Sequence, residues 1–127
     1  MGDTRTDTTV QIHDHDGVTV VEVAGEIDMA TEQPVRAVLA EQLDRRPAGL
    51  VVDLARIDFF GSAGIQLLIE AATSAQRRGV PLAVATDRRA VLRPLEITGV
   101  LDAVNVHPTL HDALAAVRPG DRRTMAH

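Results

Sequence analysis

Ser62 is the side chain of this sequence that is best placed to do chemistry. It stands in the stretch "FFGSAGIQLL", between two glycines and at the point where an apolar helical pattern begins. As an N-cap, its hydroxyl would accept a hydrogen bond from a free backbone N–H, a contribution of about 1 kcal/mol. As a phosphoserine, it would hold its charge beside a helix N-terminus, whose N–H groups and dipole attract anions. Both roles are open from the residues alone.

A third role for Ser62 is that of a nucleophile. The segment partly matches the G-x-S-x-G turn that carries the catalytic serine of many hydrolases. Phe60 occupies the position of the first glycine, however, and the sequence "ARIDFFG" predicts a loop between the serine and the strand before it. The strained turn of that motif needs glycine because a side chain crowds it. We therefore expect that the chain is not an enzyme.

Two pairs of histidines have spacings that also occur in metal sites. His13 and His15 lie in "HDHD", and His107 precedes His111 by four residues. The first pair borders a predicted hairpin turn, and a proline after His107 sets it before the predicted helix. We expect solvated turns and no metal site. No G-x-x-x-x-G-K-[ST] loop and no G-x-G-x-x-G motif is present, so we expect no cofactor.

Composition excludes further classes of function. The chain has 127 residues, no cysteine, two aromatic residues and a formal net charge of −5. A negative chain with so few aromatic rings is not expected to bind nucleic acid. Without cysteine it has neither disulfides nor thiolate metal sites. No apolar run approaches the roughly 20 residues that cross a bilayer, and the N-terminus lacks a signal-peptide core, so we expect a cytoplasmic protein.

The elements that must position Ser62 follow from the hydrophobic pattern. Asp16-Gly17 favours a tight turn and predicts a hairpin of two antiparallel strands. Nearly continuous apolar runs further on predict buried strands, the first of them in the middle of the sheet. The predicted strands are 10–13, 18–24, 49–54, 80–85 and 104–106.

Helical spacing of apolar residues predicts about four helices between these strands. They are expected to begin after Thr31, at Ser62, after a cap at Asp87, and at Thr109, whose hydroxyl would cap the N–H of Asp112. The alternation predicts a mixed, mainly parallel sheet. We expect one domain at 10–118, a disordered leader at 1–9 and a disordered tail at 119–127. The predicted buried face of the second helix is Ile65, Leu68, Ile69 and Ala72.

Three segments together resemble the anti-sigma factor antagonists, a family of single STAS domains. They are "GEIDMATEQPVRAVLAEQL", "LVVDLARIDFFGSAGIQLLIEA" and "VLRPLEITGVLDAVNVHPTLHDALAAV", and the likeness spans about residues 10–117 in order. Three matched segments are more specific than any one short motif. The resemblance implies a STAS-like α/β fold, with a mixed sheet of four to five strands flanked by about four helices.

The resemblance also implies a function. The unmodified antagonist of such a system binds an anti-sigma factor that is also a serine kinase, which releases a sigma factor for transcription. The kinase then phosphorylates a serine at the start of the second helix, which ends the binding, and a serine phosphatase reverses the modification. That phosphoacceptor corresponds to Ser62, and Asp28 corresponds to an acidic position near it. The implied partner-binding residues are Asp28, Gly61, Ser62, Ala63 and Gly64.

Gly61 departs from the family pattern, which often has an acidic residue directly before the acceptor. The missing carboxylate removes a charge from the helix start, and this is expected to alter the choice of kinase or the rate of reaction. The acceptor itself remains. An alternative hypothesis is a STAS module that acts without phosphate, as a scaffold subunit or as a sensor of a small ligand.

Overall fold

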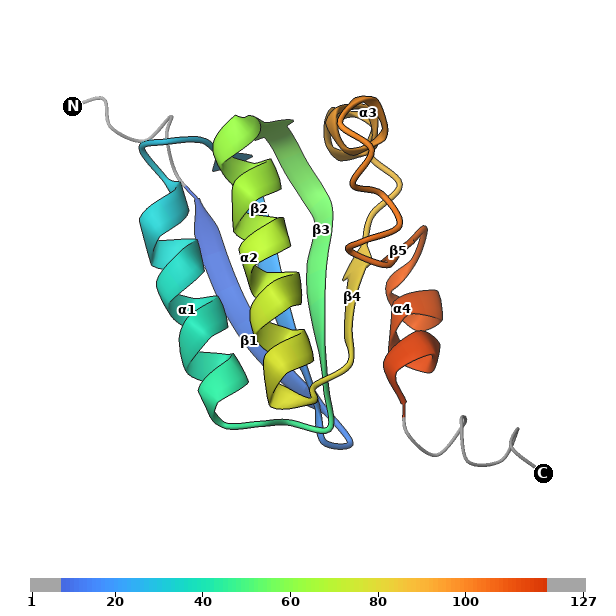
Figure 1. The fold of residues 1–127 in the computed structure, drawn as a ribbon. Helices are drawn as coiled ribbons and strands as arrows, with labels where there is room; N and C mark the ends of the chain where they lie inside the picture. The colour runs from blue at the N-terminus through green and yellow to red at the C-terminus, as the bar shows by residue number, and fades with distance from the viewer. Residues whose placement is uncertain (1–7, 119–127) are drawn as a thin grey trace.

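A computed structural model describes residues 8–118 of the chain, and over these residues a five-stranded sheet carries four helices (Figure 1). The strands are β1 (Thr9–His15), β2 (Val18–Ile27), β3 (Gly49–Phe60), β4 (Leu82–Ala85) and β5 (Val106–His107). The helices are α1 (Glu32–Asp44), α2 (Ser62–Arg78), α3 (Arg89–Ile97) and α4 (Leu110–Val117). The sheet order is β1-β2-β3-β4-β5, with β1 antiparallel to β2 and the other neighbours parallel. The predicted α/β class and mixed sheet are confirmed.

The hairpin of β1 and β2 forms where the sequence predicts it. Asp16 and Gly17 both have positive φ angles, 55° and 92°, as a two-residue hairpin turn of this type requires. The strand before the turn begins at Thr9, one residue inside the predicted leader. Thr8 is also described, and its hydroxyl donates to the carbonyl of Glu26 at 2.8 Å. Residues 1–7 of that leader and the predicted tail, 119–127, lie outside the described residues.

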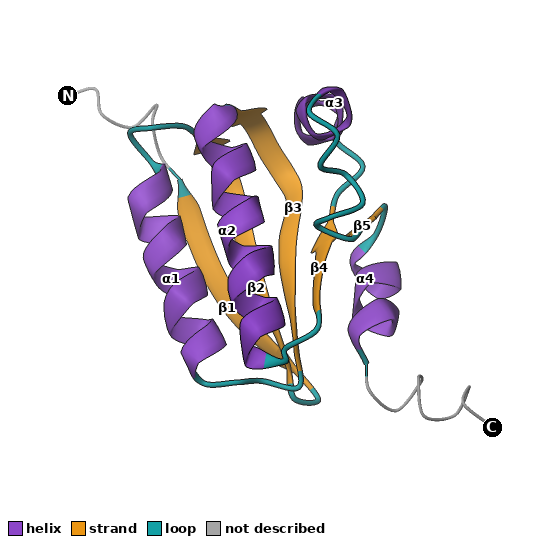
Figure 2. Cartoon of the chain, viewed as in Figure 1, coloured by secondary structure: helices purple, strands orange, loops and turns teal. Residues whose placement is uncertain are grey.

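β3 lies in the middle of the sheet and has a core on each face. Leu50, Val52 and Leu54 belong to the larger core, to which α1, α2 and α3 contribute. Val51 points the other way, into the smaller core that α4 covers. Figure 2 shows α1 and α2 side by side on one face of the sheet. This two-sided burial explains the nearly continuous apolar sequence of the strand.

The buried face of α2 differs from the predicted one. Leu68 is buried as expected, and Ile65 and Ala72 pack partly buried against the core, but Ile69 is 40% exposed. The fully buried face carries Leu67 and small residues, which allow the helix to lie close to its neighbours. A pattern based on large apolar side chains gives these small residues too little weight. The buried residues of the helix are Gly64, Leu67, Leu68, Ala71 and Ala75.

The predicted cap of α4 forms, whereas the predicted cap of α3 does not. Thr109 caps α4 as predicted, because its hydroxyl oxygen accepts the N–H of Asp112 at 3.1 Å. The predicted cap of α3 by Asp87 is wrong, since the N-cap is Arg88 and no side chain caps that helix. The N–H of Arg88 donates to the hydroxyl of Thr86 at 3.1 Å, which forms the turn before the helix instead.

The last strand begins later than predicted. Val104 is buried in a turn, and Asn105 follows it with a φ of 58°. A left-handed residue interrupts an extended strand, so β5 starts only at Val106.

Among the helices between residues 8 and 118, none has the length and hydrophobicity that a bilayer crossing needs.

Candidate functional site

Ser62 is the first residue of α2 and follows the carboxyl end of β3, at the top of the view in Figure 1. The loop predicted between the strand and the serine is wrong, because β3 continues to Phe60 and only Gly61 separates it from Ser62. The N-cap position belongs to Gly61, and no side chain caps the helix there. The carbonyl of Gly61 accepts the N–H of Gly64 at 2.9 Å, which closes the first turn. The capping role considered for Ser62 is therefore wrong. Its side chain is exposed at the helix start.

A backbone hydrogen bond brings two of the predicted site segments together. The N–H of Gly61 donates to the carbonyl of Ile27 at 3.0 Å. Ile27 ends β2 and pairs with Phe60 at the end of β3. Asp28 comes directly after Ile27, and Ser62 comes directly after Gly61. The structure thus brings the loop that holds Asp28 beside the start of α2.

Asp28 organises the turn that leads into α1. Its Oδ1 accepts the N–H of Ala30 at 2.9 Å and the N–H of Thr31 at 3.1 Å, while the Thr31 hydroxyl donates to the carbonyl of Glu26 at 2.8 Å. Its own N–H donates to the Thr31 hydroxyl oxygen at 3.0 Å. Its carbonyl accepts the N–H of Glu32 at 2.9 Å. This reciprocal arrangement gives Asp28 a structural role, whatever it contributes to a partner.

Two substitutions separate the effect of the Asp28 hydrogen bonds on stability from the effect of its charge. Asp28→Ala removes an acceptor of two backbone hydrogen bonds, so we expect it to lower the free energy of unfolding by about 0.5–2 kcal/mol. Asp28→Asn keeps an oxygen acceptor and removes only the charge, so we expect a change within about 0.5 kcal/mol. Urea denaturation of the three proteins measures both effects. An Asn variant as unstable as the Ala variant would show that the charge itself holds the turn.

The two glycines beside Ser62 have different surroundings. Gly64 is buried, and a Cβ there would lie 2.6 Å from Cε1 of the Phe60 ring. Close packing therefore explains this glycine. A Cβ on Gly61 would lie 3.3 Å from Cε2 of Phe59, and its φ of −91° is open to any residue. The acidic residue common at this position in the family would need only a small shift of the Phe59 ring.

Two exposed apolar side chains at this end of the molecule were missed by the sequence analysis. Met29 is 85% exposed in the loop after Asp28. Phe59 is 50% exposed, and the edge of its ring lies beside Gly61. Exposed aromatic and methionine side chains are enriched in protein–protein interfaces. Alternation gave no usable signal for Phe59, because Ile57 and Phe60 are both buried three residues apart and the register with β2 shifts between them.

The histidines that resemble metal ligands do not gather into a site. His13 lies 3.2 Å from a carboxylate oxygen of Glu22, and His107 contacts the Asn105 side chain at 3.0 Å. Across residues 8–118, no three His, Cys, Asp or Glu side chains are arranged to hold a metal ion.

Near Glu22, burial raises the pKa of Asp53 above its ordinary value, and the negative charge of Glu22 adds to the rise. This polar group belongs to the sheet rather than to the start of α2.

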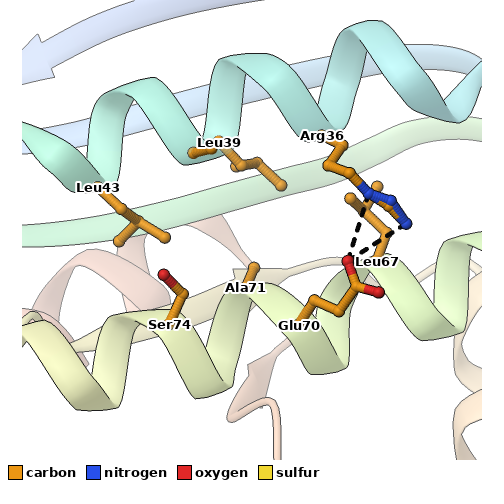
Figure 3. A pocket seen from close by; sticks show the side chains of 8 residues that line it. Arg36, Leu39, Leu43, Leu67, Glu70, Ala71 and Ser74 are labelled. Carbon is orange, nitrogen blue, oxygen red and sulfur yellow. Dashed lines mark hydrogen bonds and ion pairs between the residues drawn. The ribbon is translucent and has the colours of Figure 1, made fainter.

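A shallow groove runs between α1 and α2 (Figure 3). Leu39 and Leu43 of α1 lie opposite Ala71 and Ser74 of α2, and Leu67 of α2 lies at the end near Arg36. An ion pair between Arg36 and Glu70, with 3.3 Å between Nη2 and Oε1, bridges the two helices at one end. None of the predicted site residues lines this groove. It is therefore separate from the Ser62 region.

Comparisons with known proteins identify the family. The model of the STAS domain matches residues 9–113. Anti-sigma-F factor antagonist RsfB of Mycobacterium tuberculosis is 36% identical over 88% of this chain and 91% of its own length. RsfA, an anti-sigma-F factor antagonist of the same species, is 35% identical over 83% of this chain and 84% of its own.

A solved structure agrees with these relatives. The crystal structure of an anti-sigma factor antagonist from Mycobacterium paratuberculosis superposes with a TM-score of 0.80 at 35% identity. The match covers 88% of this chain and 95% of that one. The family predicted from the three sequence segments is confirmed. With its five-stranded mixed sheet, its matched residues 9–113 and these antagonist relatives, the chain belongs to the STAS domain family.

Proposed function

We propose that this protein is an anti-sigma factor antagonist that phosphorylation of Ser62 switches off. The unmodified protein binds an anti-sigma factor that is also a serine kinase, so that a sigma factor is released for transcription. Relatives named anti-sigma-F factor antagonists, at 35% and 36% identity, support this class of function. The observation that carries the switch is the exposed side chain of Ser62 at the first turn of α2.

The partner-binding region proposed here is called the acceptor surface. Its polar part is the loop of Asp28 and the hydroxyl of Ser62, and its apolar part is Met29 and Phe59. The small residues Gly61 and Ala63 leave the hydroxyl of Ser62 accessible to a kinase. Gly64 is buried and leaves space for the ring of Phe60. The residues of the acceptor surface are Asp28, Met29, Phe59, Gly61, Ser62 and Ala63, with Gly64 beneath them.

A phosphate on Ser62 would oppose binding through charge. It adds about −1.5 to −2 charges to a surface that already has the carboxylate of Asp28 nearby. It also adds those charges to a surface that carries the exposed apolar side chains of Met29 and Phe59, where docking removes water and makes an unpaired charge costly. The fold tolerates the same charge, because the N–H groups and dipole of a helix N-terminus favour an anion. Phosphorylation therefore changes the surface and leaves the domain folded.

The other features of the proposed function follow from this mechanism. The protein is a substrate and binding partner of the kinase rather than an enzyme, and a serine phosphatase restores its active form. It needs no cofactor, and it reaches the transcription machinery through its partner, without contacting nucleic acid. Its expected location is the cytoplasm.

Phosphorylation by the host's anti-sigma factor kinase tests the proposal. The chain has two serines, Ser62 and Ser74, and Ser74 already accepts a hydrogen bond from Arg78 at 2.7 Å in the middle of α2. Incubation with kinase and ATP is expected to add one phosphate to the native protein and to Ser74→Ala, and none to Ser62→Ala. Intact-mass and peptide mass spectrometry locate the phosphate. A phosphate on Ser74 or on a threonine would contradict the assignment.

A further inference from the structure

The two edges of the sheet are built differently. β5 forms one edge and has only two residues, Val106–His107. β1 forms the other with seven residues, "TVQIHDH", and its pairing with β2 runs without a bulge. Proteins commonly protect a sheet edge with a short strand, a bulge, a proline or charged side chains, above all lysine. β1 has no bulge, proline or lysine, and its one carboxylate, Asp14, lies next to its last residue, so we take its outer backbone groups as available for pairing.

The hairpin turn determines which backbone groups of β1 point outward. In a two-residue hairpin, the residues that flank the turn form a hydrogen-bonded pair, here His15 and Val18. Hydrogen-bonded and non-hydrogen-bonded pairs alternate along an antiparallel ladder. The N–H and C=O groups of His13 and Gln11 therefore point toward β2. Those that point away from the sheet belong to Val10, Ile12 and Asp14.

These three outward residues are evenly spaced about Ile12, which makes the edge complementary to itself. A second copy that runs antiparallel about a two-fold axis at Ile12 sets each Ile12 opposite the other, and each Val10 opposite an Asp14. Every outward N–H and C=O of the three residues then has a partner. No like charges stand directly opposite, since Asp14 meets valine and His13 meets Gln11. The Ile12 side chains, 49% exposed in the single chain, cover one another.

We propose that two copies of this chain associate through antiparallel pairing of their β1 strands, which joins their sheets into one. The contact lies on the edge of the sheet, whereas Ser62 follows the central strand β3. The dimer therefore leaves the acceptor surface of each copy available. The proposal rests on the geometry of β1 and does not depend on the function of Ser62.

Disulfide trapping tests the position of the two-fold axis. The chain has no cysteine, so an introduced thiol is the only one present. Ile12→Cys sets two thiols across the axis, where Cα atoms about 5.5 Å apart suit a disulfide. Asp14→Cys is the matched control, because its two copies would lie about 14 Å apart along the paired strands. Under mild oxidation, we expect a covalent dimer of the first variant and monomers of the second.

Sedimentation of the untagged native chain tests association without a crosslink. Between about 1 µM and about 1 mM, we expect a dimer whose share rises with concentration. Ile12→Lys places two positive charges opposite each other at the two-fold axis and is expected to weaken association by about tenfold or more. Gln11→Lys adds the same charge opposite His13 of the other copy, where it meets no second lysine, and is expected to keep the dimer. Circular dichroism verifies that each variant is folded.

Three results would overturn the proposal. The first is a native chain that stays monomeric over the whole range of concentration. The second is a dimer that Ile12→Lys leaves as tight as before, since another surface would then hold it. The third is equal crosslinking of the two cysteine variants, which would exclude the axis at Ile12.

Discussion

Replacement of Gly64 with alanine is expected to lower the free energy of unfolding by about 1–3 kcal/mol. The added Cβ would lie 2.6 Å from Cε1 of Phe60 and 2.9 Å from Cδ1 and Cζ of the same ring. Phe60 is only 4% exposed and is enclosed by the larger core, so the ring has little space into which it can move. The start of α2 must therefore shift away from β3. Urea denaturation followed by far-UV circular dichroism measures the loss.

A double-mutant cycle connects this loss to the ring. Phe60→Leu alone is expected to destabilise the protein because it leaves a cavity. In the double variant, the smaller side chain makes room for the new Cβ, so the two losses should add to less than their sum. Strictly additive losses would show that the cost of Gly64→Ala arises elsewhere, for example from the helix backbone.

Replacement of Ser62 with aspartate is expected to weaken binding of the anti-sigma factor kinase by about 10- to 100-fold. The new carboxylate imitates some of the charge of a phosphate, and like charges brought together at an interface cost up to several kcal/mol. Ser62→Ala keeps the surface small and neutral, so its affinity should stay within about threefold of the native value. Isothermal titration calorimetry with one kinase preparation compares the three proteins.

Stability should follow a different order from affinity. Because Gly61 is the N-cap, Ser62→Ala removes no cap, and we expect a change within about 0.5 kcal/mol. Ser62→Asp adds a negative charge to the first turn of α2 and should be neutral or stabilising by about 0.3–1 kcal/mol. An aspartate variant that binds weakly while folding at least as well as the native chain assigns the effect to the surface. Equal affinities of the folded Asp and Ala variants would favour a STAS module that works without phosphate.

Local chemistry explains which elements of the fold were predictable from the sequence. The Asp16-Gly17 turn and the Thr109 cap depend on residues within a few positions, and both form as expected. The start of α2 depends on a distant contact, because the N–H of Gly61 donates to Ile27 in another strand. A sequence pattern contains no trace of that bond. It places the start of the helix at Ser62, as the structure does, but it leaves a capping role of Ser62 open, whereas the N-cap is Gly61.

The candidate site was predictable to a similar extent. Ser62 and Asp28 follow from the resemblance to a family, and the structure brings their two loops together at the ends of β2 and β3. Met29 and Phe59 were missed because exposure depends on how neighbouring elements cover a residue. The sequence also could not show why residue 64 is a glycine, because only the folded structure places the Phe60 ring against it.

The most direct test of the central claim compares one protein before and after phosphorylation. Native chain with its phosphate mapped to Ser62, and the same preparation left unmodified, are each titrated into the anti-sigma factor kinase in the calorimeter. We expect the unmodified protein to bind and the phosphorylated protein to bind at least about 100-fold more weakly, while circular dichroism of the two remains the same. Equal affinity of the two forms, with the phosphate confirmed on Ser62, would contradict the account.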